Sequence, residues 1–183
     1  MSFIAPVATG DACAVPAPAP DVAARTWTGP GAAERLAILR RTRTVAMVGA
    51  SANPARASYF VATYLLASTD YDVYFVNPRA TEILGRPVYP SLAELPVVPD
   101  LVDVFRRHDD LPGVLEETLA VGARTLWLQL GSWHEEVARA GEAAGLEVVM
   151  DRCLKIEHAR FHGGLHLAGF DTGVVSSRRP RLR

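Results

Sequence analysis

Apolar and polar positions along the chain follow two alternating patterns. Five short segments are apolar nearly throughout, and they span residues 44–50, 71–78, 101–107, 123–131 and 146–152. Such strands are buried on both faces, as in a parallel sheet that helices cover. Between them, apolar residues at helical spacing predict helices within residues 29–42, 58–68, 111–122, 132–145 and 153–161. This alternation predicts an α/β fold with a single doubly wound parallel sheet of about five strands and helices on both faces.

Residues with strong helix-end preferences mark several of these helices. Pro30 suits a first helical turn, and Ser132 is a predicted N-cap. Gly122 and Gly145 suit the left-handed position that follows a helix. These residues set the expected limits of the helices around them.

Both ends of the chain lack periodic patterning. Residues 1–29 contain the run "PAPAP" and are predicted to form a flexible leader, in which Trp27 alone is expected to pack against the domain. Residues 166–183 end in "SSRRPRLR" and are predicted to form a basic, solvated tail. The folded domain is therefore predicted to span residues 30–165.

Composition narrows the classes of ligand. The chain of 183 residues is 49% apolar with a net charge of -1, so its overall charge does not attract nucleic acid or an anionic membrane surface. No apolar run reaches the ~18 residues of a membrane-spanning helix. The two cysteines, Cys13 and Cys153, lie far apart in sequence, which suits a reducing compartment, and we expect a cytoplasmic protein.

Polar, basic and glycine residues gather where the predicted strands end. In an open α/β sheet the ligand crevice lies beyond these carboxyl ends, near the point where strand order reverses. The five strand ends comprise residues 49–53, 77–79, 105–107, 129–132 and 151–153. A ligand site is therefore predicted along this edge of the sheet.

The turn "VGASANP" at residues 48–54 departs from the dinucleotide fingerprint G-x-G-x-x-G. Gly49 keeps the glycine of the tight turn, whereas Ser51 and Pro54 occupy the other two glycine positions. The helix that follows still offers amides and a positive dipole end to a phosphate. After the second strand, Asn77 and Arg79 replace the carboxylate that binds the ribose of NAD. The sequence therefore favours a phosphorylated adenine nucleotide other than NAD, and NADP stays open.

Several longer motifs carry a family resemblance over about residues 36–162. The segments "VAMVGASANPARASYFVATYL", "VYFVNPRATEILGRPVYPSLAELP", "DLVDVFRR", "LWLQLG" and "VVMDRCLKIEHARF" together resemble the small stand-alone CoA-binding proteins of bacteria and archaea. The domain of that family is Rossmann-like and is similar to the CoA-binding domain of the succinyl-CoA synthetase α subunit. The resemblance implies coenzyme A or an acyl-CoA as the ligand.

The resemblance also implies a division of roles among the strand ends. The turn after the first strand would hold the diphosphate, the second strand end would flank the adenosine, and the third would line the pantetheine groove. In that order the candidates are Gly49, Ala50, Ser51, Asn53, Arg56 and Ser58, then Asn77, Pro78 and Arg79, then Phe105 and Arg106, with Gln129 and Cys153 at the last two strand ends. Arg79 is assigned to the 3′-phosphate on physical grounds, because arginine forks onto phosphate oxygens.

No catalytic constellation stands out in the sequence, so we expect a non-catalytic binding protein. An NADP-dependent oxidoreductase domain is the alternative, although no Tyr-x-x-x-Lys pair lies in a suitable register. A third hypothesis is a regulatory or scaffold domain whose ligand controls a protein partner. A homo-oligomer is compatible with each hypothesis.

The cysteine and histidine residues near the last helix suggest two further chemistries. His158, His162 and His166 are spaced four apart, but the glycine pair after His162 would break the helix, so no metal site is predicted. Cys153 is either an ordinary buried cysteine or a reactive thiol that forms a mixed disulfide with CoA, its pKa lowered by neighbouring basic residues and the helix start.

Other polar and aromatic residues have structural interpretations. Asp103, like Asp151, is expected to pair with an arginine or to cap a helix. Trp127 is expected in the core, and Trp133 either packs near the crevice or stacks on an adenine. Glu157, with Arg160, is expected on a solvated helical face.

Overall fold

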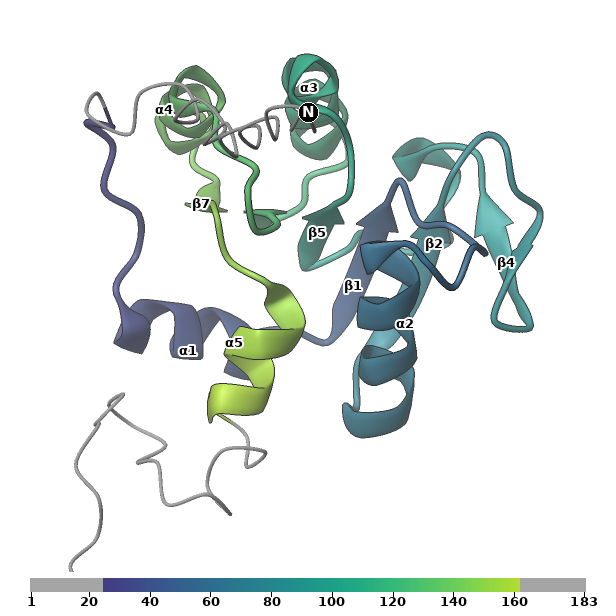
Figure 1. Ribbon diagram of the computed structural model, residues 1–183. Helices are drawn as coiled ribbons and strands as arrows, with labels where there is room; N and C mark the ends of the chain where they lie inside the picture. The colour runs from purple at the N-terminus through teal and green to yellow at the C-terminus, as the bar shows by residue number, and fades with distance from the viewer. Residues whose placement is uncertain (1–24, 162–183) are drawn as a thin grey trace, which may run out of the picture.

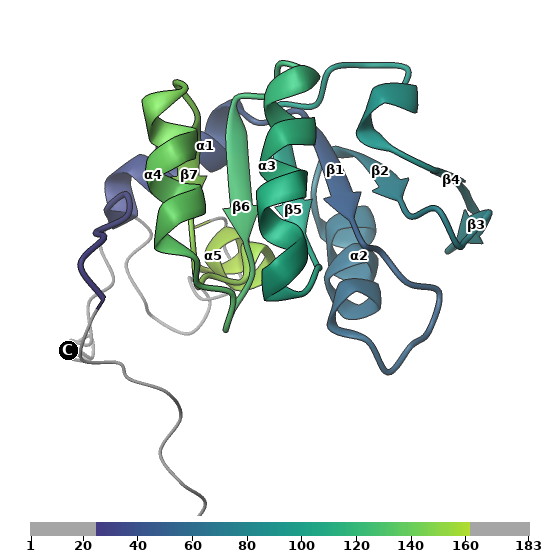
Figure 2. The same cartoon turned by 90° about the horizontal axis from the view of Figure 1, so that it is seen from above.

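The computed structural model describes residues 25–161; the predicted tail and most of the predicted leader lie outside this range. Its strands are β1 (Thr44–Val48), β2 (Asp72–Val76), β3 (Glu82–Ile83), β4 (Arg86–Tyr89), β5 (Leu101–Val104), β6 (Thr125–Leu128) and β7 (Glu147–Val149). They form one sheet in the order β3-β4-β2-β1-β5-β6-β7, in which every neighbouring pair is parallel except β3 and β4 (Figures 1 and 2). Strand order reverses at β1, which confirms the predicted doubly wound α/β fold.

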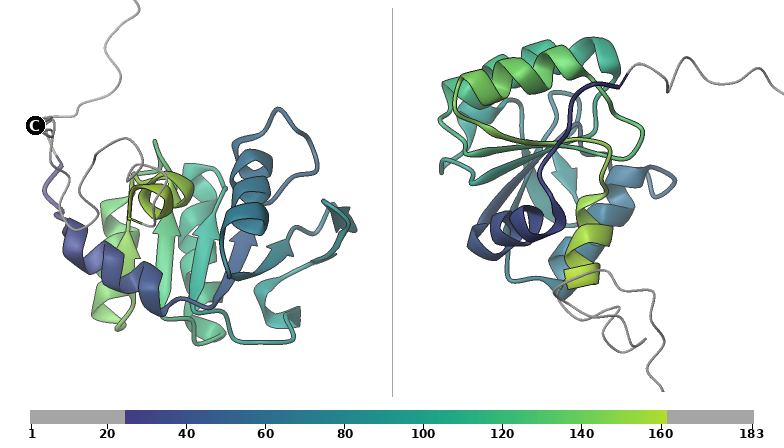
Figure 3. Two further views of the ribbon diagram at one scale, coloured as in Figure 1. Left: turned by 90° about the horizontal axis from the view of Figure 1, so that it is seen from below. Right: turned by 90° about the vertical axis from the view of Figure 1, so that its left-hand side faces the viewer.

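Helices cover both faces of this sheet. They are α1 (Ala32–Arg41), α2 (Ala57–Ser68), α3 (Leu111–Ala120), α4 (Glu135–Ala143) and α5 (Leu154–Phe161), with short 3-10 turns η2 (Leu92–Glu94) and η3 (His108–Asp110). Figure 2 shows α3 and α4 side by side over one face. The opposite face is covered by α1, α2 and α5, and the right-hand view of Figure 3 shows the sheet between the two layers.

The middle strands are buried because each supplies apolar side chains to both layers. Along β1, Val45 and Met47 belong to the core under α1, α2 and α5, whereas Ala46 and Val48 belong to the core under α3 and α4. All four residues of β5 and all four of β6 are buried as well. This double-sided core fixes the loops at the strand ends.

The edge hairpin of β3 and β4 was not expected from the sequence. β4 pairs in parallel with β2, with Val88 opposite Phe75, and β3 returns antiparallel to β4. Leu84 and Gly85 make the connecting turn with φ of 51° and 73°. Both strands are short, and β4 is half exposed, so neither produces the apolar run by which the other five strands were predicted.

The helix ends agree with the sequence at two glycines and differ at one serine. Gly122 and Gly145 follow α3 and α4 with positive φ, as predicted. Ser132 is not an N-cap, so that prediction was wrong. The N-cap of α4 is His134, whose Nδ1 accepts a hydrogen bond from the Val137 amide at 3.4 Å. Ser132 instead lies in the loop that joins β6 to α4.

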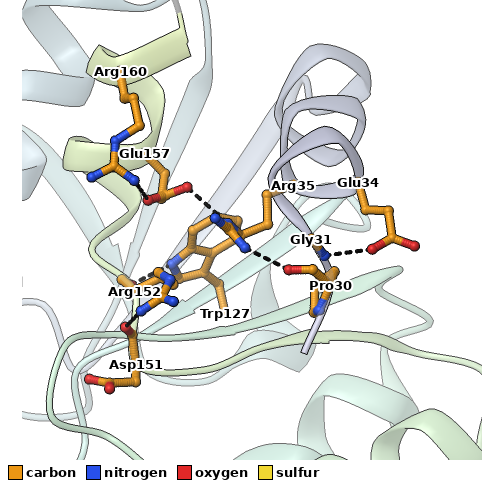
Figure 4. Close-up of polar contacts among 9 residues, drawn as sticks. All are labelled: Pro30, Gly31, Glu34, Arg35, Trp127, Asp151, Arg152, Glu157 and Arg160. Carbon is orange, nitrogen blue, oxygen red and sulfur yellow. Dashed lines mark hydrogen bonds and ion pairs between the residues drawn. The ribbon is translucent and has the colours of Figure 1, made fainter. Parts of the chain in front are cut away.

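The prediction of a solvated face at Glu157 was also wrong. Its side chain is 2% exposed and accepts from Arg35 at 2.8 Å and from Arg160 at 2.7 Å (Figure 4). Glu157 is buried by tertiary packing, since the contact between α1 and α5 brings Arg35 over its carboxylate. Beneath this cluster Trp127 is fully buried, as predicted, and its indole N–H donates to the Arg152 carbonyl at 2.7 Å.

The last residues of the predicted leader pack against the domain. Trp27 is buried, as expected, and its ring lies edge-on to Trp133 with centroids 5.7 Å apart. Thr26 donates its backbone N–H and its hydroxyl to the Glu135 carboxylate at 2.7 and 2.6 Å. These hydrogen bonds, together with those from the Trp27 amide and the Trp133 indole, lower the pKa of Glu135 to about 2. Residues 25–27 are thereby attached to the start of α4, beside the strand ends.

Candidate functional site

A cavity of about 480 Å³, which we call the central cavity, opens at the carboxyl ends of β1, β5 and β6. This is the edge of the sheet at which the sequence predicted a ligand site. Seven candidate residues line it, namely Gly49, Ser51, Arg56, Ser58, Phe105, Arg106 and Gln129. It is also lined by residues outside the candidate set, namely Ala57, Val104, His108, Leu130, Gly131, Ser132 and Trp133. Leu130, Gly131 and Ser132 belong to the end of the fourth predicted strand, residues 129–132, and Trp133 was expected near the crevice.

Gly49 makes the turn out of β1 with φ of +82°, in the left-handed region that favours glycine. A Cβ at this position would lie 2.4 Å from the Phe105 carbonyl oxygen. The Gly49 amide donates to the Val76 carbonyl at 2.8 Å, and the Phe105 amide donates to Val48 at the same distance. The turn is therefore clamped between the ends of β2 and β5, where no side chain fits.

The loop after Gly49 leaves the start of α2 open to the cavity. The Asn53 amide donates to Ser51 Oγ at 3.2 Å, and Asn53 Oδ1 accepts from the Ala55 amide at 2.9 Å. Asn53 therefore builds the loop and does not line the central cavity. The N-cap of α2, Arg56, makes no side-chain capping hydrogen bond, while Ser58 in the first turn lines the cavity. Open amides at a helix N-terminus bind anions.

Asn77, at the end of β2, also supports the site without lining the central cavity. Its Nδ2 donates to the Ala50 carbonyl at 2.7 Å, and its Oδ1 accepts from the Arg79 amide at 2.9 Å. Ala50 itself is buried, and Pro78 is exposed outside the cavity. The loops after β1 and β2 are thus joined through one amide side chain.

Arg79 lies in an adjoining hollow of about 420 Å³, which we call the arginine pocket. Arg106 lines both this pocket and the central cavity, so the two are adjacent. The arginine pocket also contains Arg107 and three carboxylates, and Arg107 pairs with Asp110 at 3.7 Å. Within residues 25–161 no carboxylate pairs with Arg79 or Arg106, so both guanidinium groups are open to a phosphate.

Gln129 rests on a buried carboxyl group in the floor of the site. Its Nε2 donates to Asp103 Oδ1 at 2.5 Å, and Asp103 is fully buried. Asp103 pairs with no arginine and caps no helix in the described part of the chain, contrary to prediction, and its Oδ2 has no hydrogen-bond partner there. Burial raises the pKa of Asp103 to about 7, against the smaller lowering effect of the Gln129 hydrogen bond.

Cys153 lies in a second adjoining hollow of about 230 Å³, which we call the apolar pocket. This pocket shares Ala57, Gln129 and Leu130 with the central cavity. Burial raises the pKa of the Cys153 thiol and outweighs the hydrogen bonds from the backbone of α5 that lower it. The hypothesis of a lowered thiol pKa was therefore wrong, because half-burial removes the water that stabilises a thiolate.

Trp133 forms part of the cavity wall just before α4. The Arg25 guanidinium lies 4.2 Å from the centroid of its ring, and the Trp27 ring meets it edge-on. Arg25 also pairs with Asp151 at 3.2 Å, which is the arginine pairing expected for that aspartate. The indole is held in place from the side of the docked leader residues.

The three histidines considered as metal ligands lie on both sides of residue 161, where the described part of the chain ends. Between residues 25 and 161 no three His, Cys, Asp or Glu side chains form a group that could hold a metal ion. His158 Nδ1 lies 3.0 Å from the Tyr64 hydroxyl in a hydrogen bond, and His162 and His166 are outside this range.

No helix within residues 25–161 is long and apolar enough to span a membrane.

The strand order, the turn at Gly49 and the cavity beyond it define a Rossmann-like domain with a ligand-sized site at the reversal of strand order. The chain belongs to the CoA binding domain family, whose sequence model matches residues 43–159. This match confirms the family resemblance noted in the sequence.

Individual relatives agree with this assignment. The chain is 39% identical over 130 residues to the uncharacterized protein YneT of Bacillus subtilis, covering 71% of this chain and 96% of YneT. The structure of a hypothetical protein from Pyrococcus horikoshii has a TM-score of 0.70 at 36% identity, with 74% of this chain and 94% of that one covered. An ADP-forming acetate–CoA ligase of Archaeoglobus fulgidus is 26% identical over 122 residues, which are 61% of this chain and 18% of the ligase.

Proposed function

We propose that this protein binds coenzyme A or an acyl-CoA at the carboxyl ends of the strands and does not transform it. The observation that carries the proposal is the row of three adjacent hollows: the arginine pocket, the central cavity and the apolar pocket. Coenzyme A has the same order of chemistry, from a phosphorylated adenosine through a diphosphate to an uncharged arm that ends in a thiol. Membership of the CoA binding domain family supports this reading.

The polar groups of the site support a specific orientation of the ligand. The open N-terminus of α2 and Arg56 suit the diphosphate, because amides and a guanidinium both stabilise anionic oxygens. Arg79, with Arg106, suits the 3′-phosphate, since neither pairs with a carboxylate within residues 25–161. The pantetheine arm then runs past Phe105 and Gln129 toward Cys153 in the apolar pocket.

The state of two groups, the Cys153 thiol and the Asp103 carboxyl, supports binding without catalysis. The raised pKa of Cys153 keeps its thiol protonated at neutral pH, and a thiol in that form is a poor nucleophile. Asp103 is fully buried, so a ligand in the cavity reaches it only through Gln129. The matching region is 18% of the length of the ligase relative. We infer that the shared portion supplies binding.

Calorimetric titration of the full chain with CoA, dephospho-CoA, NADP and NAD tests the ligand. We expect CoA to bind most tightly and dephospho-CoA about tenfold more weakly, because a charge-assisted hydrogen bond to the 3′-phosphate is lost. The variant R79A should lose that tenfold preference, whereas R40A, which removes an exposed arginine of α1, should keep it. Tighter binding of NADP than of CoA would favour an oxidoreductase domain instead.

The non-catalytic part of the proposal needs a separate measurement. Acetyl-CoA incubated with the protein should be recovered intact, as seen by mass spectrometry of the ligand and of the protein. Hydrolysis of the thioester, or a mass increase on Cys153, would show that the site carries out chemistry.

A further inference from the structure

The apolar pocket is built differently from the rest of the site. Its lining residues come from α2, the end of β6 and the start of α5. The helices α2 and α5 cover the same face of the sheet (Figure 3). The apolar walls of the pocket come from Ala57, Phe60, Val61, Leu130 and Ile156, with the neutral thiol of Cys153 among them. Among the described residues, no carboxylate lines the pocket, in contrast to the arginine pocket at the other end of the site.

Large apolar side chains are exposed at the mouth of this pocket. Phe60 is 63% exposed, Leu130 58% and Ile156 43%. Single exposed apolar residues are ordinary, but a group of them around one hollow marks a surface that covers an apolar partner. The Lys155 ammonium lies 3.5 Å from the centroid of the Phe60 ring, so a cation–π contact holds this aromatic wall in place.

The pocket adjoins the central cavity, and this adjacency points to its occupant. Ala57, Gln129 and Leu130 line both. A ligand whose diphosphate lies at the start of α2 would therefore enter the apolar pocket with its thiol end first. Whatever is attached to that sulfur would lie against Phe60 and Ile156.

We infer that the apolar pocket binds the acyl chain of an acyl-CoA, and that the preferred ligands carry an uncharged chain of medium length. This inference rests on the proposed function, because it requires CoA to lie along the central cavity. A volume of about 230 Å³ accommodates roughly seven methylene groups if each takes about as much space as a water molecule, ~30 Å³. Chains much longer than eight carbons would extend into solvent.

The neutral thiol of Cys153 is compatible with a bound thioester. Exchange of an acyl group onto a cysteine requires the thiolate, and burial in this pocket disfavours that form. The acyl chain would therefore be held beside the sulfur without transfer. A chain that ends in a carboxylate would place that charge against the apolar walls of the pocket, and the Lys155 ammonium would have to leave the Phe60 ring to offset it.

A chain-length series on the full protein tests the inference. CoA, acetyl-CoA, butyryl-CoA, octanoyl-CoA, dodecanoyl-CoA and succinyl-CoA are titrated calorimetrically under one set of conditions. Full burial of a methylene group tightens binding about fourfold, and about half of that free energy is expected in a pocket open on one side. We therefore expect about twofold tighter binding per methylene from acetyl-CoA to octanoyl-CoA, no further gain for dodecanoyl-CoA, and no preference for succinyl-CoA.

A matched pair of variants locates the effect. I156S removes one apolar wall that lies outside the central cavity and should weaken octanoyl-CoA about fivefold while leaving CoA within twofold. L119S replaces a helical residue of α3 that is 37% exposed, close to the 43% of Ile156. It should change neither the affinity for octanoyl-CoA nor the affinity for CoA.

The outcomes separate this inference from the proposed function. If CoA binds and chain length has no effect, or if I156S leaves octanoyl-CoA unchanged, the acyl pocket is refuted and the CoA site stands. If neither CoA nor any acyl-CoA binds, the proposed function fails, and the acyl pocket with it. Should I156S fail to fold, as judged by circular dichroism, the chain-length series on the unmodified protein still decides.

Discussion

Replacing Gly49 by alanine tests whether the turn at the end of β1 is closed by steric contact. The new Cβ would lie 2.4 Å from the Phe105 carbonyl oxygen, and an ordinary contact requires about 1 Å more. The loop after β5 cannot yield freely, because the Phe105 amide is hydrogen-bonded to Val48 at 2.8 Å. The Gly49 amide is likewise bonded to Val76 at 2.8 Å. The substitution therefore forces two strand ends apart.

The expected magnitude has two parts. An alanine with positive φ costs about 1–2 kcal/mol, and overpacking against a fixed backbone adds about 1–3 kcal/mol. We therefore expect G49A to lower the free energy of unfolding by about 2–5 kcal/mol. Displacement of Phe105 would also move Arg106, which connects the central cavity to the arginine pocket, so CoA affinity should fall in the protein that remains folded.

G122A is the matched control for this substitution. Gly122 has a φ of +76°, close to the +82° of Gly49, but an added Cβ there meets nothing within 4 Å. The backbone cost and the entropy of the unfolded chain are thus shared by both variants, and their difference reports the contact with Phe105. Urea unfolding, followed by tryptophan fluorescence, measures both. Equal losses of stability in G49A and G122A would refute the steric closure of the turn.

Two further predictions concern buried charge. Because the pKa of Asp103 is raised to about 7, the folded protein binds a proton that the unfolded chain releases near pH 4, so stability should fall as pH rises from about 4 to 7 and then level off. D103N keeps an acceptor for Gln129 and should flatten this dependence, measured by urea unfolding across the pH range; an unchanged profile would show that Asp103 is not its source. E157A leaves Arg35 and Arg160 uncompensated and should cost about 3–5 kcal/mol, whereas E157Q, which retains an acceptor, should cost less. Equal losses in both variants would contradict this expectation, because they would show that the retained acceptor contributes nothing and that the whole loss comes from the carboxylate charge.

The central strands could be predicted from sequence because their burial is a local property. β1, β5 and β6 lie in the middle of the sheet, so an apolar run is sufficient to mark each of them. The edge hairpin of β3 and β4 depends on pairing with β2, a tertiary relation that leaves no apolar run. Glu157 shows the same limit, because its burial depends on Arg35, which is 122 residues away in sequence.

At the site, the sequence predicted positions better than roles. Gly49 could be assigned a role because glycine is the residue type that adopts the positive φ of such a turn without steric cost. The charge state of Cys153 could not be predicted in this way. Neighbouring basic residues suggested a lowered pKa, whereas burial, which depends on the three-dimensional structure, raises the pKa of the thiol. His108 lines the central cavity from η3, beyond the predicted strand end, and no sequence pattern marked it.

The candidate residues divide into those that line the hollows and those that build them, and this division determines what each substitution can report. Both asparagines hydrogen-bond to the backbone through their side chains, Asn53 to Ala55 and Asn77 to Ala50 and Arg79. Their loss would loosen the loops after β1 and β2 for any ligand. The side chains of Arg79 and Arg106 make no such bonds to other residues between 25 and 161, so their substitution should change affinity according to the phosphates of the ligand. Selectivity between CoA, dephospho-CoA and NADP therefore depends on the arginines, in a cavity whose shape the asparagines and Gly49 fix beforehand.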